Sequence, residues 1–346
     1  MAHYFAYYTA VRSSFFRHTA TALLLGQSLV ACSPVPRPSY NDRSAVIYGE
    51  DGRIEVIDET DPLWLEKARA TVALVARSQL TPSSDGHSFQ IQTHPSTLPY
   101  PFCPGERFTA QPEVAACTGV LVAPDLILTA AHCLHLPPGC NPETGCDYAA
   151  QVCPSVSFLF DWRLDAETRT APTQIDSHSV YQCRKILAGA RDPVQKLDWL
   201  LVQLDRETTG RTPVTLPLFP TSKELVVGRP VVQIGHPLGR PLKILHGAEL
   251  LPSQHAHQLV ANTDTFVGSS GGPLFDAQTG VLIGLLSTGE RDFELDFAQE
   301  SRCLRSRVCT AETSCLGERY SRVEQAMDTI IRLVLLRPGD SPQPGG

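Results

Sequence analysis

Short apolar runs separated by turn residues dominate the chain from Cys117 onward. The runs are TGVLVA, DLILTAA, VSFLFDW, DWLLVQL, VVGRPVVQIG and GVLIGLLS, and Pro, Gly and Asp stand between them. Many short strands with frequent turn signals are typical of antiparallel barrels and sandwiches. The pattern therefore predicts an all-β protein built from antiparallel sheet.

Two segments depart from this strand pattern. Near the C-terminus, apolar residues recur at the spacing of an amphipathic helix, which we expect to close the domain. They are Val323, Met327, Ile330, Ile331 and Val334. Upstream, residues 45–59 show strand-like Val and Ile around an Asp-Gly turn, and residues 61–80 begin helix-like and become strand-like. The pattern leaves open whether residues 45–95 inhibit the protein before processing.

The first 31 residues predict an export signal. They contain Arg12 and Arg17, no acidic residue, and then the apolar run TALLLGQSLVA. A run of about a dozen residues is too short to cross a bilayer, for which about 20 are needed. Its removal would change the formal net charge from −7 to −9.

Cys32 is a candidate lipidation site. Leu29-Val30-Ala31-Cys32 resembles the lipobox of bacterial lipoproteins, in which the cysteine carries lipid and becomes the first mature residue. The chain has eleven cysteines, so removing Cys32 leaves an even number for disulfides in an oxidising compartment. Residues 32–44, rich in proline, would form a tether to the membrane, with the domain facing periplasm or exterior. The alternative is an ordinary signal peptide that contains a cysteine.

Composition excludes several function classes. The chain is 42% hydrophobic and 19% charged, as in ordinary globular proteins, and it has no basic block that would track phosphates. We therefore expect no nucleic-acid partner. His132-Cys133-x-His135 and His255-x-His257 could suggest metal ligands, but Cys303, Cys309 and Cys315 lack the close pairing of a zinc site. We expect disulfides, no metal and no cofactor.

The stretch DTFVGSSGGPLFD, residues 264–276, places two serines among glycines. Gly, Ser and Pro together usually mark a loop without chemistry. A serine hydroxyl becomes a useful nucleophile only when a general base lies nearby. The rest of the chain therefore decides between a plain turn and a nucleophile.

A candidate base lies in CTGVLVAPDLILTAAHCLH, residues 117–135. Two short strands joined by a Pro-Asp turn lead into His132. A histidine at a strand end is more often structural than catalytic, but the whole string resembles the histidine segment of the trypsin-like serine proteases. This resemblance implies a disulfide between Cys117 and Cys133 around the base.

A candidate acid lies in KLDWLLVQLDRE, residues 196–207. Asp198 directly precedes an apolar strand, where the family keeps the acid that orients its histidine. Asp192 precedes proline in a polar loop, and Asp205 stands beside charged residues. Asp198 is the one expected to be shielded from water.

The resemblance covers about residues 45–337 and implies a chymotrypsin-like fold of two packed antiparallel β-barrels, followed by a disordered tail over 338–346. In that fold Ser270 attacks the scissile carbonyl, His132 moves the proton and Asp198 orients His132. The N–H groups of Gly268 and Ser270 would form the oxyanion hole. The resemblance implies an endopeptidase acting on protein or peptide substrates, and we expect a monomer. An inactive protease-like surface binding module is the alternative.

The cleaved bond is a further expectation. VIYGEDGR and GHPLGRPLKI resemble segments of bacterial branches that include the glutamyl endopeptidases. Asp264 matches the acid at the base of the primary pocket of trypsin, which would select Lys or Arg, with Ser287 and Gly289 on the far wall. Selection of Glu or of an apolar residue, with Asp264 merely capping a turn, stays open. Ser269 replaces the acid that digestive enzymes use on activation, so that switch is not expected.

Overall fold

The structure of the protein, a computed structural model, describes residues 47–94, 96, 98–140, 142, 148–217, 225–297, 302–310 and 315–335. These residues all fall within one contact unit, Arg43–Gly346. The expected export signal, the tether with Cys32, and the expected tail lie outside the described residues.

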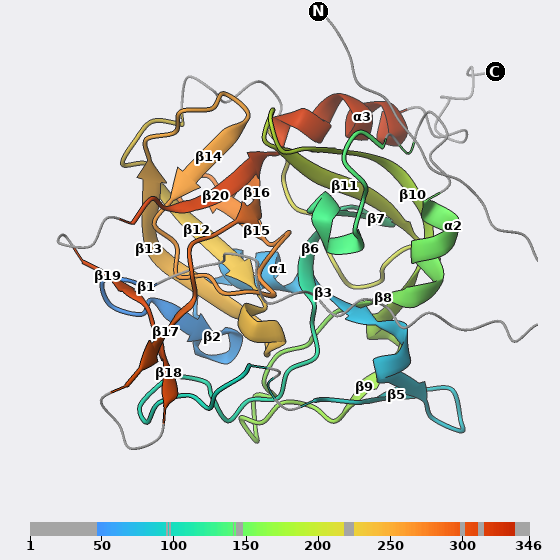
Figure 1. Cartoon of the computed structure of the whole chain (residues 1–346). Coiled ribbons are helices and arrows are strands. Elements are labelled where there is room, and N and C mark those ends of the chain that lie inside the picture. The colour runs from blue at the N-terminus through green and yellow to red at the C-terminus, as the bar shows by residue number, and fades with distance from the viewer. Residues whose placement is uncertain are drawn as a thin grey trace, which may run out of the picture. The chain divides into compact units, whose positions relative to one another are not determined.

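The first barrel is a closed sheet of six antiparallel strands in the order β10, β11, β7, β6, β3, β8 (Figure 1). Its strands are β3 Thr71–Ala76, β6 Cys117–Ala123, β7 Leu126–Thr129, β8 Val156–Leu159, β10 Val180–Asp192 and β11 Leu197–Leu204. Every residue of β6 is buried, because both faces of this strand are covered. A continuous apolar run was therefore the right signal for a central strand.

The second barrel holds the C-terminal strands in the order β12, β15, β16, β20, β14, β13, and a β12–β13 pairing closes it. Its strands are β12 Pro230–Gly235, β13 Lys243–Leu251, β14 Gln258–Ala261, β15 Pro273–Asp276, β16 Leu282–Thr288 and β20 Glu318–Arg322. One apolar cluster contains residues of both barrels, including Leu201 and Phe275. The predicted fold of two packed antiparallel barrels is confirmed.

Short elements surround the barrels. The remaining strands are β1 Ile47–Tyr48, β2 Arg53–Glu55, β4 Leu80–Pro82, β5 Ser88–Ile91, β9 Gln174–Asp176, β17 Phe293–Asp296, β18 Cys303–Ser306 and β19 Val308–Cys309. The α-helices are α1 Pro62–Arg69, α2 Ala149–Val152 and α3 Glu324–Leu335. No helix in the described ranges combines the length and apolarity needed to cross a membrane.

Helix α3 is the predicted C-terminal helix, and it contacts β11 of the first barrel (Figure 1). Val323 and Ile330 pack into the shared core. Ile331 does not follow the prediction, because it is 41% exposed while Ala326 faces the core. Adjacent residues on a helix point about 100° apart, and here Ile330 points to the core while Ile331 lies toward solvent.

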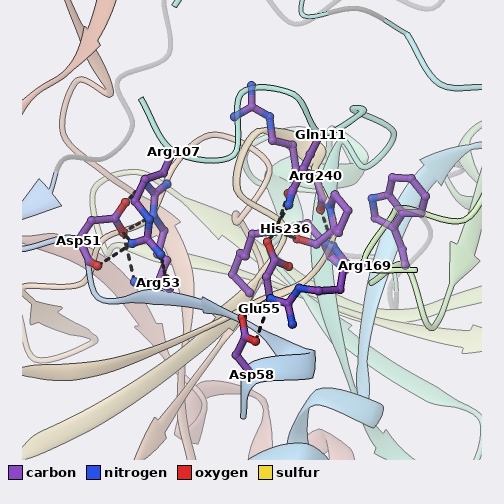
Figure 2. Close-up of polar contacts among 12 residues, drawn as sticks. Asp51, Arg53, Glu55, Asp58, Arg107, Gln111, Arg169, His236 and Arg240 are labelled. Carbon is purple, nitrogen blue, oxygen red and sulfur yellow. Dashed lines mark hydrogen bonds and ion pairs between the residues drawn. The ribbon is translucent and has the colours of Figure 1, made fainter. Parts of the chain in front are cut away.

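Residues 47–59 are part of the folded body. β1 pairs with β19 and β2 pairs with β13, so the N-terminal segment adds to the C-terminal half of the chain. Figure 2 shows Asp51 and Arg53 meeting Arg107, and Asp58 meeting Arg169. Further along the chain, β3 is a strand of the closed first barrel. Loss of residues 45–95 would therefore open that barrel, which argues against a removable inhibitory segment of this length.

Disulfides join cysteines that lie between 6 and 200 residues apart in the chain. The pairs within the described residues are Cys103–Cys303, Cys117–Cys133, Cys153–Cys183 and Cys309–Cys315. The Cys117–Cys133 pair is the one that the family resemblance implied. Cys146 lies outside the described residues.

Candidate active site

His132 and Asp198 are brought together by neighbouring strands of the first barrel. β7 leads into a 3₁₀ turn, Ala131–Leu134, that carries His132. Leu200 of β11 pairs with Thr129 of β7, so the start of β11 lies beside this turn. Asp198 Oδ2 is 2.6 Å from His132 Nδ1, and Asp198 Oδ1 accepts a hydrogen bond from the His132 backbone N–H at 2.9 Å. Two contacts thus fix the imidazole relative to the carboxylate.

The surroundings of Asp198 keep its carboxylate ionised. The residue is only 8% exposed, and the Ser287 hydroxyl donates to Oδ2 at 2.9 Å. Burial raises the pKa of Asp198, but the charge of His132 and hydrogen bonds from His132 and Ser287 hold that pKa below its ordinary value. A carboxylate facing Nδ1 favours the tautomer with a proton on Nδ1, which leaves Nε2 free to accept one.

The two competing acids have structural contacts of their own. Asp192 Oδ1 accepts the backbone N–H groups of Val194 and Gln195, which caps a turn. Asp205 pairs with Arg206 and accepts the backbone N–H of Gln182. Within the described residues neither of these two carboxylates is seen to contact His132, whereas Asp198 does.

Ser270 stands on a tight glycine turn just before β15. Gly268 and Gly271 have φ values of 96° and 76°, in the left-handed region that favours glycine. A Cβ on Gly268 would lie 2.5 Å from His236 O and 2.6 Å from Gly239 N. The turn therefore needs glycine for both conformation and space.

The turn lies against the segment that carries His132. The backbone N–H of Thr118, next to Cys117, donates to Ser270 O at 2.8 Å. Cys133 Sγ, in the disulfide that follows His132, lies 3.5 Å from the same oxygen. The structure thus brings the segments of His132, Asp198 and Ser270 to one place between the barrels.

Two backbone N–H groups of the turn have no hydrogen-bond acceptor within the part of the chain that the structure describes. They belong to Gly268 and Ser270, whereas the intervening Ser269 N–H donates to Phe266 O at 2.9 Å. Pairs of unengaged N–H groups are the usual means of stabilising an oxyanion. These are the two donors expected from the sequence.

Asp264 is anchored to the N-terminal segment. Its Oδ1 accepts the backbone N–H of Tyr48 at 2.7 Å, and its Oδ2 accepts that of Gly52 at 2.8 Å. Burial raises the pKa of Asp264 to about 6, against the lowering effect of these two bonds. Both oxygens thus have backbone partners, which favours the alternative in which Asp264 is a structural acceptor rather than the base of a substrate pocket.

The two residues expected on the pocket wall lie at the end of β16 and directly after it. Ser287 turns its hydroxyl to Asp198, a contact that the sequence analysis did not assign to it. Gly289 is buried in the segment that follows β16. The motif LLSTG carries no signal that its serine will meet an aspartate from the other barrel, because the contact spans 89 residues.

Glu318 is a buried acid that sequence reasoning missed. It accepts hydrogen bonds from Thr265 Oγ1 at 3.0 Å and from the backbone N–H of Glu290 at 3.2 Å. Complete burial raises its pKa well above the ordinary value, and the nearby charges of Asp292 and Glu290 act in the same direction. Glu318 thus links the segment before the glycine turn to the segment after β16.

Metal ligation does not fit either of two groups of cysteine, histidine and aspartate side chains among the described residues. Cys117, His132 and Cys133 lie close enough together to hold an ion, as do Cys103, Asp296 and Cys303. The sulfurs in each group are joined in a disulfide, so they are not the thiolates that bind metals.

Comparison with known proteins yields one family match. Residues 117–285 match the trypsin-like peptidase domain, a range that contains His132, Asp198 and Ser270. The match supports a peptidase. No curated protein matches the chain.

The comparison with solved structures gives matches at low identity. The structure of HBP is 16% identical with a TM-score of 0.47, and the comparison covers 85% of this chain and 100% of that one. Human heparin binding protein gives 16% identity, a TM-score of 0.46 and the same coverage. The VesB protease of Vibrio cholerae gives 16% identity and a TM-score of 0.43, covering 80% of this chain and 66% of that one.

Proposed function

We propose that this protein is an exported serine endopeptidase that cleaves peptide bonds through Ser270, His132 and Asp198. The observation that carries the proposal is the placement of His132 Nδ1 2.6 Å from the buried carboxylate of Asp198, beside the glycine turn that bears Ser270. The match of residues 117–285 to the trypsin-like peptidase domain supports the same class of reaction.

In the proposed mechanism His132 Nε2 removes the proton from the Ser270 hydroxyl as its oxygen attacks the scissile carbonyl carbon. The carbonyl oxygen becomes an oxyanion that the N–H groups of Gly268 and Ser270 stabilise. His132 then donates its proton to the leaving amine, and an acyl-enzyme remains on Ser270. Water, activated by His132, releases the acid product. Asp198 stabilises the imidazolium throughout.

Covalent labelling tests this proposal directly. A fluorophosphonate reacts with a serine hydroxyl only when a base activates it, so we expect one label per chain, located by peptide mass analysis on Ser270. The alternative is an inactive binding module of the same fold. Absence of label on the folded protein, together with absence of peptide hydrolysis, would favour that alternative.

Cleavage after Lys or Arg would require Asp264 to face the substrate. Because both Asp264 oxygens accept backbone N–H groups, we expect Asp264→Asn to leave the order of preference among cleaved residues unchanged. The measurement is kcat/KM for a panel of peptides that differ only at the cleaved residue, including Arg, Lys, Glu and Leu. A preference for Arg and Lys that disappears in Asp264→Asn would restore the pocket role, and a preference for Glu or Leu would identify another specificity.

We also propose that Cys32 carries lipid and anchors the protein to a bacterial membrane, with the barrels facing periplasm or exterior. Four disulfides among the described residues support an oxidising compartment. We expect Cys32→Ser to move the protein from the detergent phase to the aqueous phase, and intact-mass analysis to show loss of the lipid. Ser33→Ala, beside the same site, is the control and should stay with detergent. A Cys32→Ser protein that partitions like the wild type would contradict the anchor.

A further inference from the structure

The geometry points to Thr118 as a positioning residue for the two backbone N–H groups that would face the oxyanion. This inference rests on the proposed function, because it assigns a role within the same reaction. Thr118 is the second residue of β6 in the first barrel, and it is completely buried. The residues it holds lie on the turn that leads into β15 of the second barrel.

Thr118 bonds to both residues that carry these N–H groups. Its hydroxyl donates to Gly268 O at 2.9 Å, and its backbone N–H donates to Ser270 O at 2.8 Å. Thr129 Oγ1 donates to Thr118 O at 2.7 Å, which holds Thr118 in place. Burial excludes water from these bonds, so no solvent competes for them.

The Thr118 hydroxyl also supports the loop from His236 to Leu238, which holds the peptide bond before Gly268. Thr118 Oγ1 accepts the backbone N–H of His236 at 3.1 Å. Two residues later, Leu238 donates its N–H to Val267 O at 2.6 Å. Leu238 has a φ of 58°, a left-handed conformation that costs energy for a branched residue and persists only when its surroundings hold it. Thr118 is one of the groups that hold this loop.

These bonds fix the direction of the Gly268 N–H. The Val267 carbonyl and the Gly268 N–H belong to one planar trans peptide, so the N–H points away from the loop when Leu238 holds the carbonyl. The next peptide is held by the Thr118 hydroxyl through the Gly268 carbonyl. Glycine rotates about its backbone bonds more freely than any other residue. Both peptides that flank Gly268 therefore need an external bond. Thr118 holds the second one directly and supports the first one through its bond to the His236 N–H.

Thr118→Val tests the inference, because it keeps the shape of the side chain and removes the hydroxyl. We expect kcat to fall by about 10- to 100-fold with KM nearly unchanged, somewhat less than the 10²- to 10³-fold typical for loss of a whole oxyanion donor. A peptide aldehyde, whose hemiacetal oxygen takes the place of the oxyanion, should lose affinity by the same factor as kcat/KM. Thr118→Ser keeps the hydroxyl and should retain most of the activity.

The matched control is Thr71→Val, which removes another buried hydroxyl from the same barrel. Thr71 is 1% exposed and donates to Lys67 O at 2.9 Å, in a bond that involves no residue of the glycine turn. It should leave kcat and aldehyde affinity unchanged, even if it lowers the melting temperature.

A folded Thr118→Val protein with wild-type kcat and aldehyde affinity would overturn the inference, as would equal losses in Thr118→Val and Thr118→Ser. If Thr118→Val does not fold, Thr118→Ala compared with Thr118→Ser makes the same test. A wild-type protein that neither hydrolyses peptides nor labels on Ser270 is a separate result, which overturns the proposed function and this inference with it.

Discussion

Peptide hydrolysis falls by about 10⁶-fold in Ser270→Ala and by a similar factor in His132→Ala, if the proposed mechanism is correct. Ser270 and His132 act together in one proton transfer, so either residue is ineffective once the other is removed. The Ser270→Ala, His132→Ala double variant should therefore be hardly slower than either single variant. The measurement is kcat for a peptide substrate, with circular dichroism and thermal unfolding to show that each protein is folded.

Ser269→Ala is the matched control for Ser270→Ala. Ser269 stands beside Ser270 and is buried, and its hydroxyl makes no hydrogen bond within the described residues. Its removal should leave kcat/KM within about threefold of the wild type, because losing an unpaired hydroxyl breaks no bond. Retained hydrolysis in Ser270→Ala, or its loss in Ser269→Ala alone, would show that the nucleophile is assigned to the wrong serine.

Asp198→Asn lowers kcat by about 10⁴-fold at neutral pH, the second of the two largest effects expected. An asparagine amide group would donate a hydrogen bond to His132 Nδ1, which moves the ring proton to Nε2. In that tautomer Nε2 can no longer accept the proton of Ser270. The Ser287 hydroxyl, 2.9 Å from Asp198 Oδ2, would keep a partner in the variant and limit rearrangement. Kinetics should therefore change far more than the melting temperature.

Asp192→Asn tests whether any nearby acid would serve. Asp192 caps a turn through the N–H groups of Val194 and Gln195, so its replacement should affect stability slightly and kcat hardly at all. If Asp192→Asn were as slow as Asp198→Asn, the assignment of the acid would have to be revised. If neither variant were slower than the wild type, His132 would not depend on a carboxylate.

The strand pattern predicted the fold class well, because a barrel strand is signalled by its own residues. β6 and β7 follow from the apolar runs on either side of a Pro-Asp turn, and β16 follows from GVLIGLLS. The run VVGRPVVQIG predicted the start of its strand less exactly, since β12 begins only at Pro230. Gly228 lies just before that strand with a φ of 83°, so a turn interrupts the apolar run there.

The residues of the candidate site also differ in how far the sequence could predict them. His132, Asp198 and Ser270 could each be proposed from a few neighbouring residues, because a strand end or a glycine turn is a local feature. The partners of Asp264 could not, since Tyr48 and Gly52 lie 216 and 212 residues away in the chain. The contact of Ser287 with Asp198 and that of Thr118 with Gly268 could not be predicted for the same reason, because each joins segments of different barrels.

The sequence by itself determined the antiparallel strands, the C-terminal helix and the residue types available for chemistry at each turn. Those features depend on backbone preferences and apolar spacing over a few residues. Only the tertiary structure decided which buried polar atoms face one another, and which cysteines pair across as many as 200 residues. Most buried carboxylates and hydroxyls have a hydrogen-bond partner once water is excluded, and the register of strands from distant parts of the chain decides which partner that is.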